Sequence, residues 1–169
     1  LGYDPILELT CQDHELTIKT GMTITKKVEH PREYIREILA ENRNPKLEGM
    51  PTFTGGFVGY FSYDYIKYSE PSLRLNAKDE EGFKDVDLML FNKVIAFDNF
   101  KQKIILIINV KTDNLETNYN KAETELANME NLILHGKKAE ERPLKLKTPF
   151  RPLFTKEEIK VTDSARVLT

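Results

Sequence analysis

The sequence contains no tryptophan, one cysteine and three histidines among its 169 residues. A lone cysteine cannot form an internal disulfide, which excludes a disulfide-stabilised secreted scaffold and fits a reducing compartment. Neither a Cys-x-x-Cys nor a His-Glu-x-x-His spacing occurs, so a zinc site has no support from the sequence. Cysteine and histidine chemistry is therefore not expected to define this protein.

Long apolar runs and an excess of charge of one sign are also missing. No segment approaches the ~20 apolar residues that span a bilayer, and no secretory signal opens the chain. The formal net charge is −2 and the basic residues are dispersed, which argues against nucleic-acid binding. We predict a cytoplasmic protein that contacts neither membrane nor nucleic acid.

The most informative segment that is present covers residues 51–70, PTFTGGFVGYFSYDYIKYSE. Gly55, Gly56 and Gly59 stand among aromatic residues. Glycine allows close backbone approach or positive φ, and aromatic rings supply large buried area. A phosphate-binding loop would need Gly-Lys-Ser/Thr or a complete Gly-x-Gly-x-x-Gly, so the segment predicts a tight packing junction instead.

The first third of the chain predicts a hairpin followed by a helix. Residues 6–11 and 15–19 are short apolar-bearing runs on either side of a Gln-Asp-His turn. Pro31 is suited to the first position of a helix. The helix has one apolar stripe, made of Tyr34, Ile35, Ile38 and Leu39.

The middle and end of the chain predict more strands and a second helix. Residues 57–61 read as a buried strand, with Ser62 capping a short helix through Tyr68. Residues 86–91 and 94–97 are strand material, and we expect one long strand there. Residues 103–110 are apolar on both faces, which predicts a strand in the middle of a sheet. Residues 119–133 predict a helix, which Gly136 ends.

Strands and helices do not alternate strictly, which favours local antiparallel pairing. We therefore predict an α+β fold: a layered antiparallel sheet with helices packed outside. Residues 1–136 would form one domain, truncated at its start. Residues 137–169 would form a linker and tail, because residues 137–153 are charged and proline-rich.

Each residue that suggests chemistry also has a plainer interpretation. Cys11 has strand spacing with Leu7 and Leu9, which predicts a small buried core residue rather than a nucleophile. Asp85 and Asp87 stand at i and i+2, so on a strand they share a face. One interpretation is that they bind a cation or act as paired acids. We favour the other, in which both carboxylates are hydrated at the start of the strand and discourage edge pairing.

The remaining candidates are weighed in the same way. Asp64 is expected to accept a backbone hydrogen bond, and Lys67 to form an ion pair or a cation–π contact. The tyrosines would line a ligand cleft or pack half-buried, and we favour packing; they are Tyr60, Tyr63, Tyr65 and Tyr68. The histidines are expected at the surface; they are His14, His30 and His135.

Residues 51–70 strongly resemble a segment in the N-terminal domain of the large component of anthranilate synthase. Residues 85–103, DVDLMLFNKVIAFDNFKQK, and residues 1–9, LGYDPILEL, resemble two further segments of that family in the same order. The resemblance runs from about residue 1 to residue 158. The large component of aminodeoxychorismate synthase shares the plan and is the alternative, and an unrelated binding module is a third hypothesis.

The resemblance implies a fragment of a larger, two-lobed enzyme subunit. The parent enzyme converts chorismate and glutamine or ammonia to anthranilate in tryptophan biosynthesis, with a glutamine amidotransferase partner and Mg²⁺. In that family the catalytic and metal-binding residues lie in a C-terminal chorismate-binding domain, which we expect to be missing here. We therefore assign no catalytic, cofactor-binding or metal-binding residue and expect a non-catalytic scaffold or regulatory domain that self-associates when alone.

The tail of the chain and the effector pocket carry separate expectations. Residues 154–158 resemble the entry into the family's first catalytic-domain helix, whereas residues 159–169 depart from it, because β-branched residues interrupt helical spacing. The Leu-Leu-Glu-Ser-like stretch that helps form the family's tryptophan pocket is absent. We therefore do not expect tryptophan to bind.

Overall fold

The computed structural model describes residues 1–70, 72–75 and 79–138. The chain divides into one compact unit, Leu1–Gly136, and a second, Lys137–Thr169. Only residues 137 and 138 of the second unit are described, so the predicted linker and tail lie almost entirely outside the described residues.

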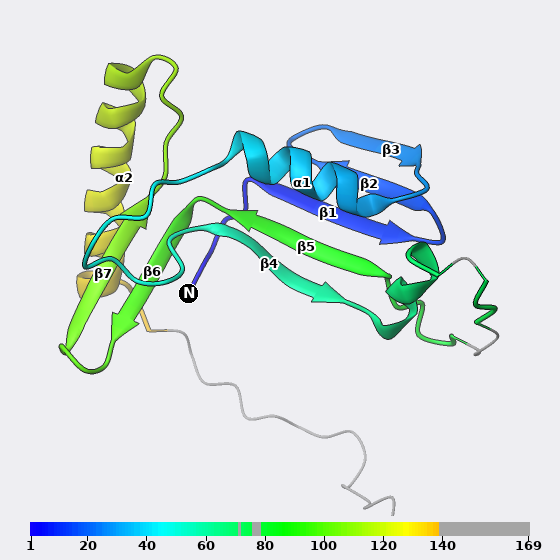
Figure 1. Ribbon diagram of the computed structural model, residues 1–169. Helices are drawn as coiled ribbons and strands as arrows, with labels where there is room; N and C mark the ends of the chain where they lie inside the picture. Colours follow the sequence, from blue (N-terminus) through cyan, green and yellow to red (C-terminus); the bar gives the residue numbers. More distant parts are fainter. Residues whose placement is uncertain (71, 76–78, 139–169) are drawn as a thin grey trace, which may run out of the picture. The chain divides into compact units, whose positions relative to one another are not determined.

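Five strands of the first unit form an antiparallel sheet in the order β3-β2-β1-β5-β4 (Figure 1). The pairing of β1 with β2 confirms the predicted hairpin, and β3, which the sequence analysis did not predict, extends it. The bounds are β1 Leu7–Gln12, β2 Glu15–Lys19, β3 Thr23–Lys27, β4 Gly56–Phe61 and β5 Val86–Phe91.

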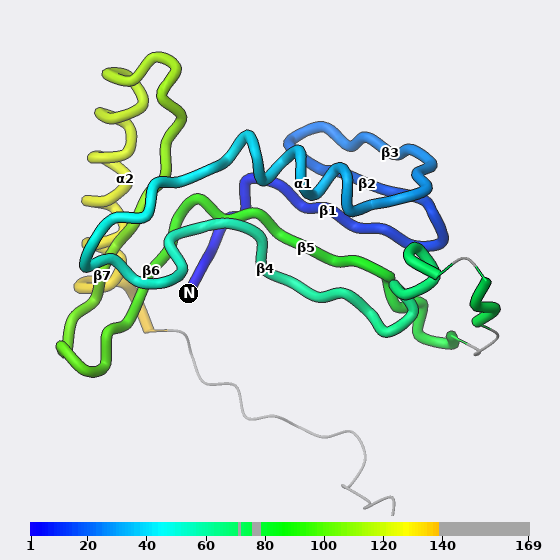
Figure 2. The backbone as a smooth tube through the Cα atoms, viewed as in Figure 1, coloured from blue at the N-terminus to red at the C-terminus, as the bar shows by residue number. Residues whose placement is uncertain are grey.

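A second, two-stranded antiparallel sheet joins β6, Lys93–Asp98, to β7, Lys103–Ile108. The hairpin turn is fixed by Asp98, whose carboxylate accepts hydrogen bonds from the backbone N–H groups of Phe100 and Lys101. Helix α2, Leu115–His135, contacts β7. Figure 2 shows the chain passing directly from the five-stranded sheet into this hairpin at the end of β5.

The main core lies on one face of the five-stranded sheet, where helix α1, Pro31–Glu41, and the 3₁₀ helix η1, Tyr63–Tyr68, pack. Pro31 occupies the first turn of α1 as predicted. The buried side chains come from strands and both helices; they are Leu9, Cys11, Leu16, Val28, Ile35, Tyr68, Val86 and Leu88. The burial of Cys11 confirms its predicted role as a core residue.

The opposite face of the same sheet remains exposed at its β4 end. Val58 pairs with Met89, and Tyr60 pairs with Asp87. Val58, Tyr60 and Met89 all keep a large exposed fraction. We call these three residues the outer-face patch.

Three strand predictions were wrong. β4 is not a buried strand but the edge of its sheet, since within residues 1–70, 72–75 and 79–138 it pairs with β5 alone. Residues 86–91 and 94–97 are strands as predicted, but they form two strands and not one long strand, because the chain leaves one sheet at Asn92 and enters the other. β7 does not lie mid-sheet: among the described residues it pairs with β6 alone.

The Ser62 cap was also wrong in detail. Ser62 holds the N-cap position of η1 but makes no capping hydrogen bond, and its Oγ is buried without a hydrogen-bond partner in the described part of the chain. The two α-helices were predicted within a few residues of their ends, and the α+β class with antiparallel sheets is confirmed. No helix in the described part of the chain has the length and apolar character to cross a bilayer.

Candidate functional site

The densest group of polar side chains lies where the β1–β2 turn, η1 and the start of β5 meet. We call it the Tyr68 cluster; it comprises Cys11, Asp13, His14, Lys67, Tyr68 and Asp85. Its centre is closed to solvent, since Asp85 is 3% exposed and Tyr68 is 4% exposed.

Asp85 and Tyr68 are linked directly. The Tyr68 hydroxyl donates to Asp85 Oδ2 over 2.7 Å. The backbone N–H of Asp13 donates to the same oxygen over 2.9 Å, and that of His14 donates to the Tyr68 oxygen over 3.1 Å. A buried polar group needs such partners to offset lost hydration, so the turn, η1 and β5 are held together by one network.

Lys67 neutralises the charge of this network. Its Nζ lies 2.7 Å from Asp13 Oδ1 and 2.9 Å from Asp85 Oδ2. It also lies 5.7 Å from the centroid of the Tyr68 ring. Both interactions expected for Lys67, the ion pair and the cation–π contact, are therefore present. The ammonium group compensates the buried carboxylate, which would otherwise be very costly.

The electrostatics favour neutral forms of the cysteine and the tyrosine. Burial raises the pKa of the Tyr68 hydroxyl far above its ordinary value, and the hydrogen bonds with Cys11 and Asp85 add to the shift. Burial likewise raises the pKa of the Cys11 thiol. Because the thiolate is the reactive form of cysteine, this environment suits a packed structural residue and not a nucleophile.

The structure separates the two aspartates that the sequence placed together. The Asp85 carboxylate enters the Tyr68 cluster, whereas Asp87 Oδ2 accepts a hydrogen bond from Lys84 over 2.9 Å. The prediction that both solvate the strand entry was wrong for Asp85, because its partners come from distant turns. The described residues contain no group of three or more His, Cys, Asp or Glu side chains that would hold a metal ion.

Two of the three histidines contact Tyr68, and the ring of His14 packs edge-on against the Tyr68 ring with centroids 4.8 Å apart. His14 Nδ1 lies 3.0 Å from the Val28 oxygen and His30 Nδ1 lies 3.2 Å from the Tyr68 oxygen. His135 contacts Asn131 in its own helix. Of the four tyrosines, Tyr68 is buried, Tyr65 packs on the core, and Tyr60 and Tyr63 are exposed.

The predicted packing junction at the glycines is confirmed at two positions. A Cβ on Gly59, whose φ is +156°, would collide with the carbonyl oxygen of Asp87 on β5. A Cβ on Gly55 would press on the Asn109 amide, which donates to the Thr54 oxygen over 2.6 Å. The glycines therefore bring backbone close to backbone and do not form a phosphate-binding loop.

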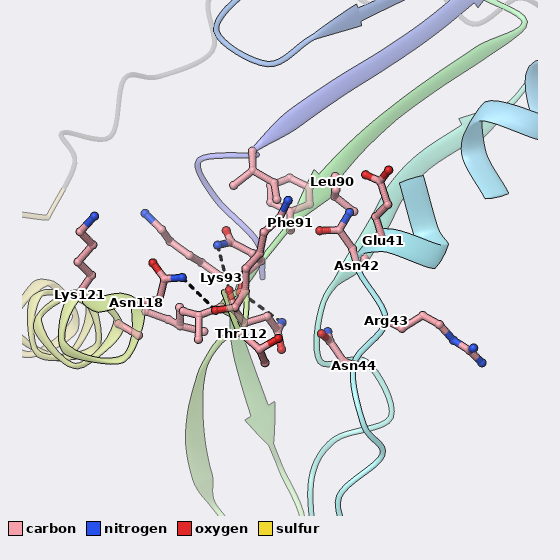
Figure 3. Close-up of a pocket in the computed structure, with 18 of the residues that line it drawn as sticks. Glu41, Asn42, Arg43, Asn44, Leu90, Phe91, Lys93, Thr112, Asn118 and Lys121 are labelled. Atoms are coloured by element: carbon pink, nitrogen blue, oxygen red, sulfur yellow. Dashed lines mark hydrogen bonds between the residues drawn. The ribbon is translucent and has the colours of Figure 1, made fainter. Parts of the chain in front are cut away.

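A second feature is a cleft of about 800 Å³, lined by both polar and apolar side chains, between the end of α1, the β5–β6 junction and the start of α2 (Figure 3). Asn42 and Asn44 line it from the segment after α1, and Asn118 and Lys121 line it from α2. In Figure 3 the Arg43 side chain extends away from these residues.

Lys93 is the best-anchored cation of the cleft. Its Nζ lies 3.0 Å from Asp4 Oδ2 and 3.0 Å from Glu125 Oε2. Hydrogen bonds to Asp4 and Glu125 raise the pKa of Lys93. Lys93 thereby links the N-terminal segment, β6 and α2, and its charge is already compensated within the chain.

The sequence analysis predicted neither the two ion pairs of Lys93 nor the burial of Asp85 in the Tyr68 cluster. Their partners stand 17 to 89 residues away in the chain, so no local spacing marks them. The sequence signal was that Asp85 and Lys93 each stand at the start of a predicted strand. A charged residue at a strand end is equally well explained by contact with solvent.

Comparison with known proteins decides the family. A sequence profile described as chorismate binding enzyme matches residues 4–160. The chain belongs to this family. It is 36% identical over 139 residues to anthranilate synthase component 1 of Acinetobacter calcoaceticus, covering 79% of this chain and 28% of the relative. It is 31% identical over 121 residues to the same component of Acetivibrio thermocellus, covering 70% and 24%.

A solved structure agrees with the fold of this chorismate binding enzyme family member. Anthranilate synthase component I from Streptococcus pneumoniae TIGR4 matches with a TM-score of 0.53 and 24% identity, over 75% of this chain and 28% of that one. The resemblance inferred from the sequence is confirmed. The chain spans about a quarter of the length of these relatives.

Proposed function

We propose that this chain is the N-terminal scaffold and regulatory domain of an anthranilate synthase large subunit, and that it is not catalytic by itself. The parent subunit would convert chorismate and glutamine or ammonia to anthranilate for tryptophan biosynthesis, in the cytoplasm. The observation that carries the proposal is the shared name of the relatives, since those reported above are all anthranilate synthase component 1.

The chemistry of the described residues supports a structural role. The reaction needs a general acid and a metal-bound substrate carboxylate. The Tyr68 cluster offers instead a compensated ion pair and two groups whose raised pKa values keep them protonated. The residues that the structure describes contain no group of three or more His, Cys, Asp or Glu side chains that would hold a metal ion, and we propose that the metal and the reacting groups belong to the remainder of the parent subunit.

The outer-face patch supplies a surface for that remainder. Val58 and Met89 face each other across β4 and β5, and both are substantially exposed, as is Tyr60. Clustered exposed apolar residues mark interaction surfaces. We propose that the remainder of the parent subunit covers this patch, and that a glutamine amidotransferase subunit joins the complete assembly.

The test is a domain exchange with the anthranilate synthase component 1 of Acinetobacter calcoaceticus. Residues of this chain would replace the matching region of the Acinetobacter calcoaceticus component, and anthranilate would be followed by its fluorescence with chorismate, Mg²⁺ and ammonia. We expect the chimera to be active and the isolated chain to be inactive. A chimera that carries Gly59→Val, which introduces a collision with β5, is the control and should lose activity.

Anthranilate formation by the isolated chain would contradict the proposal. If this chain supported activity in the matching chimera of an aminodeoxychorismate synthase component I but not in the anthranilate synthase chimera, the alternative parent would be favoured; the relatives reported above do not favour it.

A further inference from the structure

The first residues of the chain begin a third strand beside β6. The backbone N–H of Ile95 donates to the Leu1 oxygen over 2.8 Å, and the Leu1 ammonium donates to the Ile95 oxygen over 2.7 Å. Gly2 forms an antiparallel bridge with Val94, and Figure 1 shows the N-terminus beside β6. This is the only isolated bridge within residues 1–70, 72–75 and 79–138, so the other strand edges of that part carry no such partial pairing.

Side-chain contacts also hold this N-terminal segment against β6. Lys93 Nζ lies 3.0 Å from Asp4 Oδ2 and 5.8 Å from the centroid of the Tyr3 ring. A Cβ on Gly2 would lie 2.8 Å from two ring carbons of Phe91, so glycine allows a backbone approach that a larger residue would block. The position of the segment therefore does not depend on the two hydrogen bonds of Leu1 alone.

The pairing fixes the path of any residue that is joined to Leu1. Because antiparallel strands run in opposite directions, the residue before Leu1 would lie opposite Ala96, and the one before that opposite Phe97. Ile95 directs its N–H and C=O toward Leu1 and away from β7, and backbone directions alternate along a strand, so Phe97 directs its own N–H and C=O to the same side. No strand of the described chain pairs with Phe97 on that side.

The β6–β7 sheet would gain stability from a third strand. Two-stranded sheets are marginal in water. Phe97 is 55% exposed, and Ile104, which lies opposite Phe97 on β7, is 49% exposed. A strand beside Phe97 would add backbone hydrogen bonds and a cross-strand neighbour for the Phe97 side chain.

We propose that, in the parent subunit, the polypeptide joined to the amino side of Leu1 continues as an antiparallel strand along residues 96–98 and completes a three-stranded sheet with β6 and β7. Backbone continuity selects this occupant. Leu1 and Gly2 already lie beside Ile95 and Val94, and a residue bonded to Leu1 reaches the next position without the loss of translational and rotational freedom that a separate molecule incurs. The inference rests on the proposed function in one respect, that this chain is part of a longer subunit.

The experiment places five residues before Leu1 of the full chain, with threonine and valine in alternation as a β-forming probe. Hydrogen exchange of the Phe97 amide measures the pairing, because this N–H would donate to the added strand. We expect exchange at Phe97 to be slower by about tenfold or more than in the chain without the extension, since the amide gains a hydrogen bond.

Two matched variants of the extension, each with one proline, test the register. Proline two positions before Leu1 removes the N–H that would donate to the Phe97 oxygen, and it should abolish the slower exchange. Proline directly before Leu1 has its nitrogen on the side away from β6, where an edge strand tolerates proline, and most of the slower exchange should remain.

Unchanged exchange at Phe97 in the extended chain would overturn the proposal. Equal effects of the two prolines would also overturn it, as would exchange that slows with rising protein concentration, because that result indicates pairing with a second copy. The measurement uses no chorismate, so its failure can be distinguished from failure of the proposed function. An inactive chimera together with slower exchange at Phe97 would contradict the proposed function alone.

Discussion

Asp85 is the buried charged residue at the centre of the Tyr68 cluster. Its carboxylate accepts from the Tyr68 hydroxyl and the Asp13 amide and faces Lys67 at 2.9 Å. Removing one member of a buried ion pair leaves the other uncompensated, which costs more than the pair contributes. Asp85 therefore governs whether the β1–β2 turn, η1 and β5 stay together.

Asp85→Asn should lower the free energy of unfolding by about 2–3 kcal/mol, because the neutral amide cannot compensate Lys67. Asp87→Asn is the matched control, since Asp87 pairs with Lys84 near the surface. It should cost about 0–1 kcal/mol. Urea unfolding measures both variants, and equal losses would contradict this assignment.

Gly59→Ala tests the backbone contact between β4 and β5. The added Cβ would meet the Asp87 carbonyl oxygen at a positive φ, and we expect a loss of roughly 2 kcal/mol or more. Gly82→Ala is the control, because Gly82 also has a positive φ but nothing lies within 4 Å of the added atom. It should cost only about 1 kcal/mol. Thermal unfolding separates the two, and a smaller loss at position 59 would refute the close contact.

Individual residues were predictable where their role is local. The close backbone approach at the glycines and the burial of Cys11 follow from steric size and strand alternation. The burial of Asp85 was not predictable, because its partners Tyr68 and Asp13 lie 17 and 72 residues away.

At the scale of elements, α2 shows the difference between an apolar stripe and a buried one. The stripe predicted the helix correctly, yet Met129 alone is buried, whereas Tyr119 and Ile133 on the same stripe remain exposed. The two-stranded sheet is too narrow to cover the whole helix, so the packing of α2 depends on a few residues.

Met129→Ala should therefore destabilise the β6–β7–α2 part by about 2–4 kcal/mol, through lost burial and a cavity. Leu132→Ala removes a side chain that is 59% exposed and should change stability by about 0.5 kcal/mol or less. Hydrogen exchange in α2 and β7 measures the effect locally. Similar exchange in the two variants would show that Met129 does not anchor the helix.

Strand positions were predicted better than strand neighbours. The alternation of β1, β2 and β5 is visible in the sequence, but the order of strands in a sheet depends on contacts between distant segments. β5 and β6 were predicted as one long strand because the apolar pattern is almost continuous. In the structure the strand is interrupted at Asn92, whose backbone oxygen accepts a hydrogen bond from the distant Asn109 N–H.

For the molecule as a whole, the Tyr68 cluster predicts sensitivity to alkali. Burial raises the pKa of Cys11 and Tyr68 above their ordinary values of 9.0 and 10.0. Burial alone would lower the pKa of Lys67, but hydrogen bonds with Asp13 and Asp85 outweigh it, and the net shift is upward from 10.5. Groups that keep their protons longer when folded contribute full stability below the unfolded pKa, and this contribution is lost as pH rises above it.

The free energy of unfolding should therefore begin to fall above about pH 9 and fall more steeply above about pH 10. Above pH 10, Tyr68→Phe should reduce the slope by about 1.4 kcal/mol per pH unit, because one tyrosine proton no longer dissociates on unfolding. Tyr63→Phe is the control, since Tyr63 is exposed, and its slope should match the unsubstituted chain. Urea titrations at several pH values measure both slopes, and identical slopes for the two variants would contradict the role of the cluster.

The sequence by itself determined the α+β class, the two α-helices, most strands and the family, because these depend on periodicity, steric size and short motifs that neighbours in the chain carry. Only the tertiary structure decided which strands are edges, that Asp85 is buried against Tyr68 and Lys67, and that Lys93 joins Asp4 to Glu125. Those features depend on contacts between residues that are far apart in the chain, and such contacts cannot be predicted from local sequence patterns.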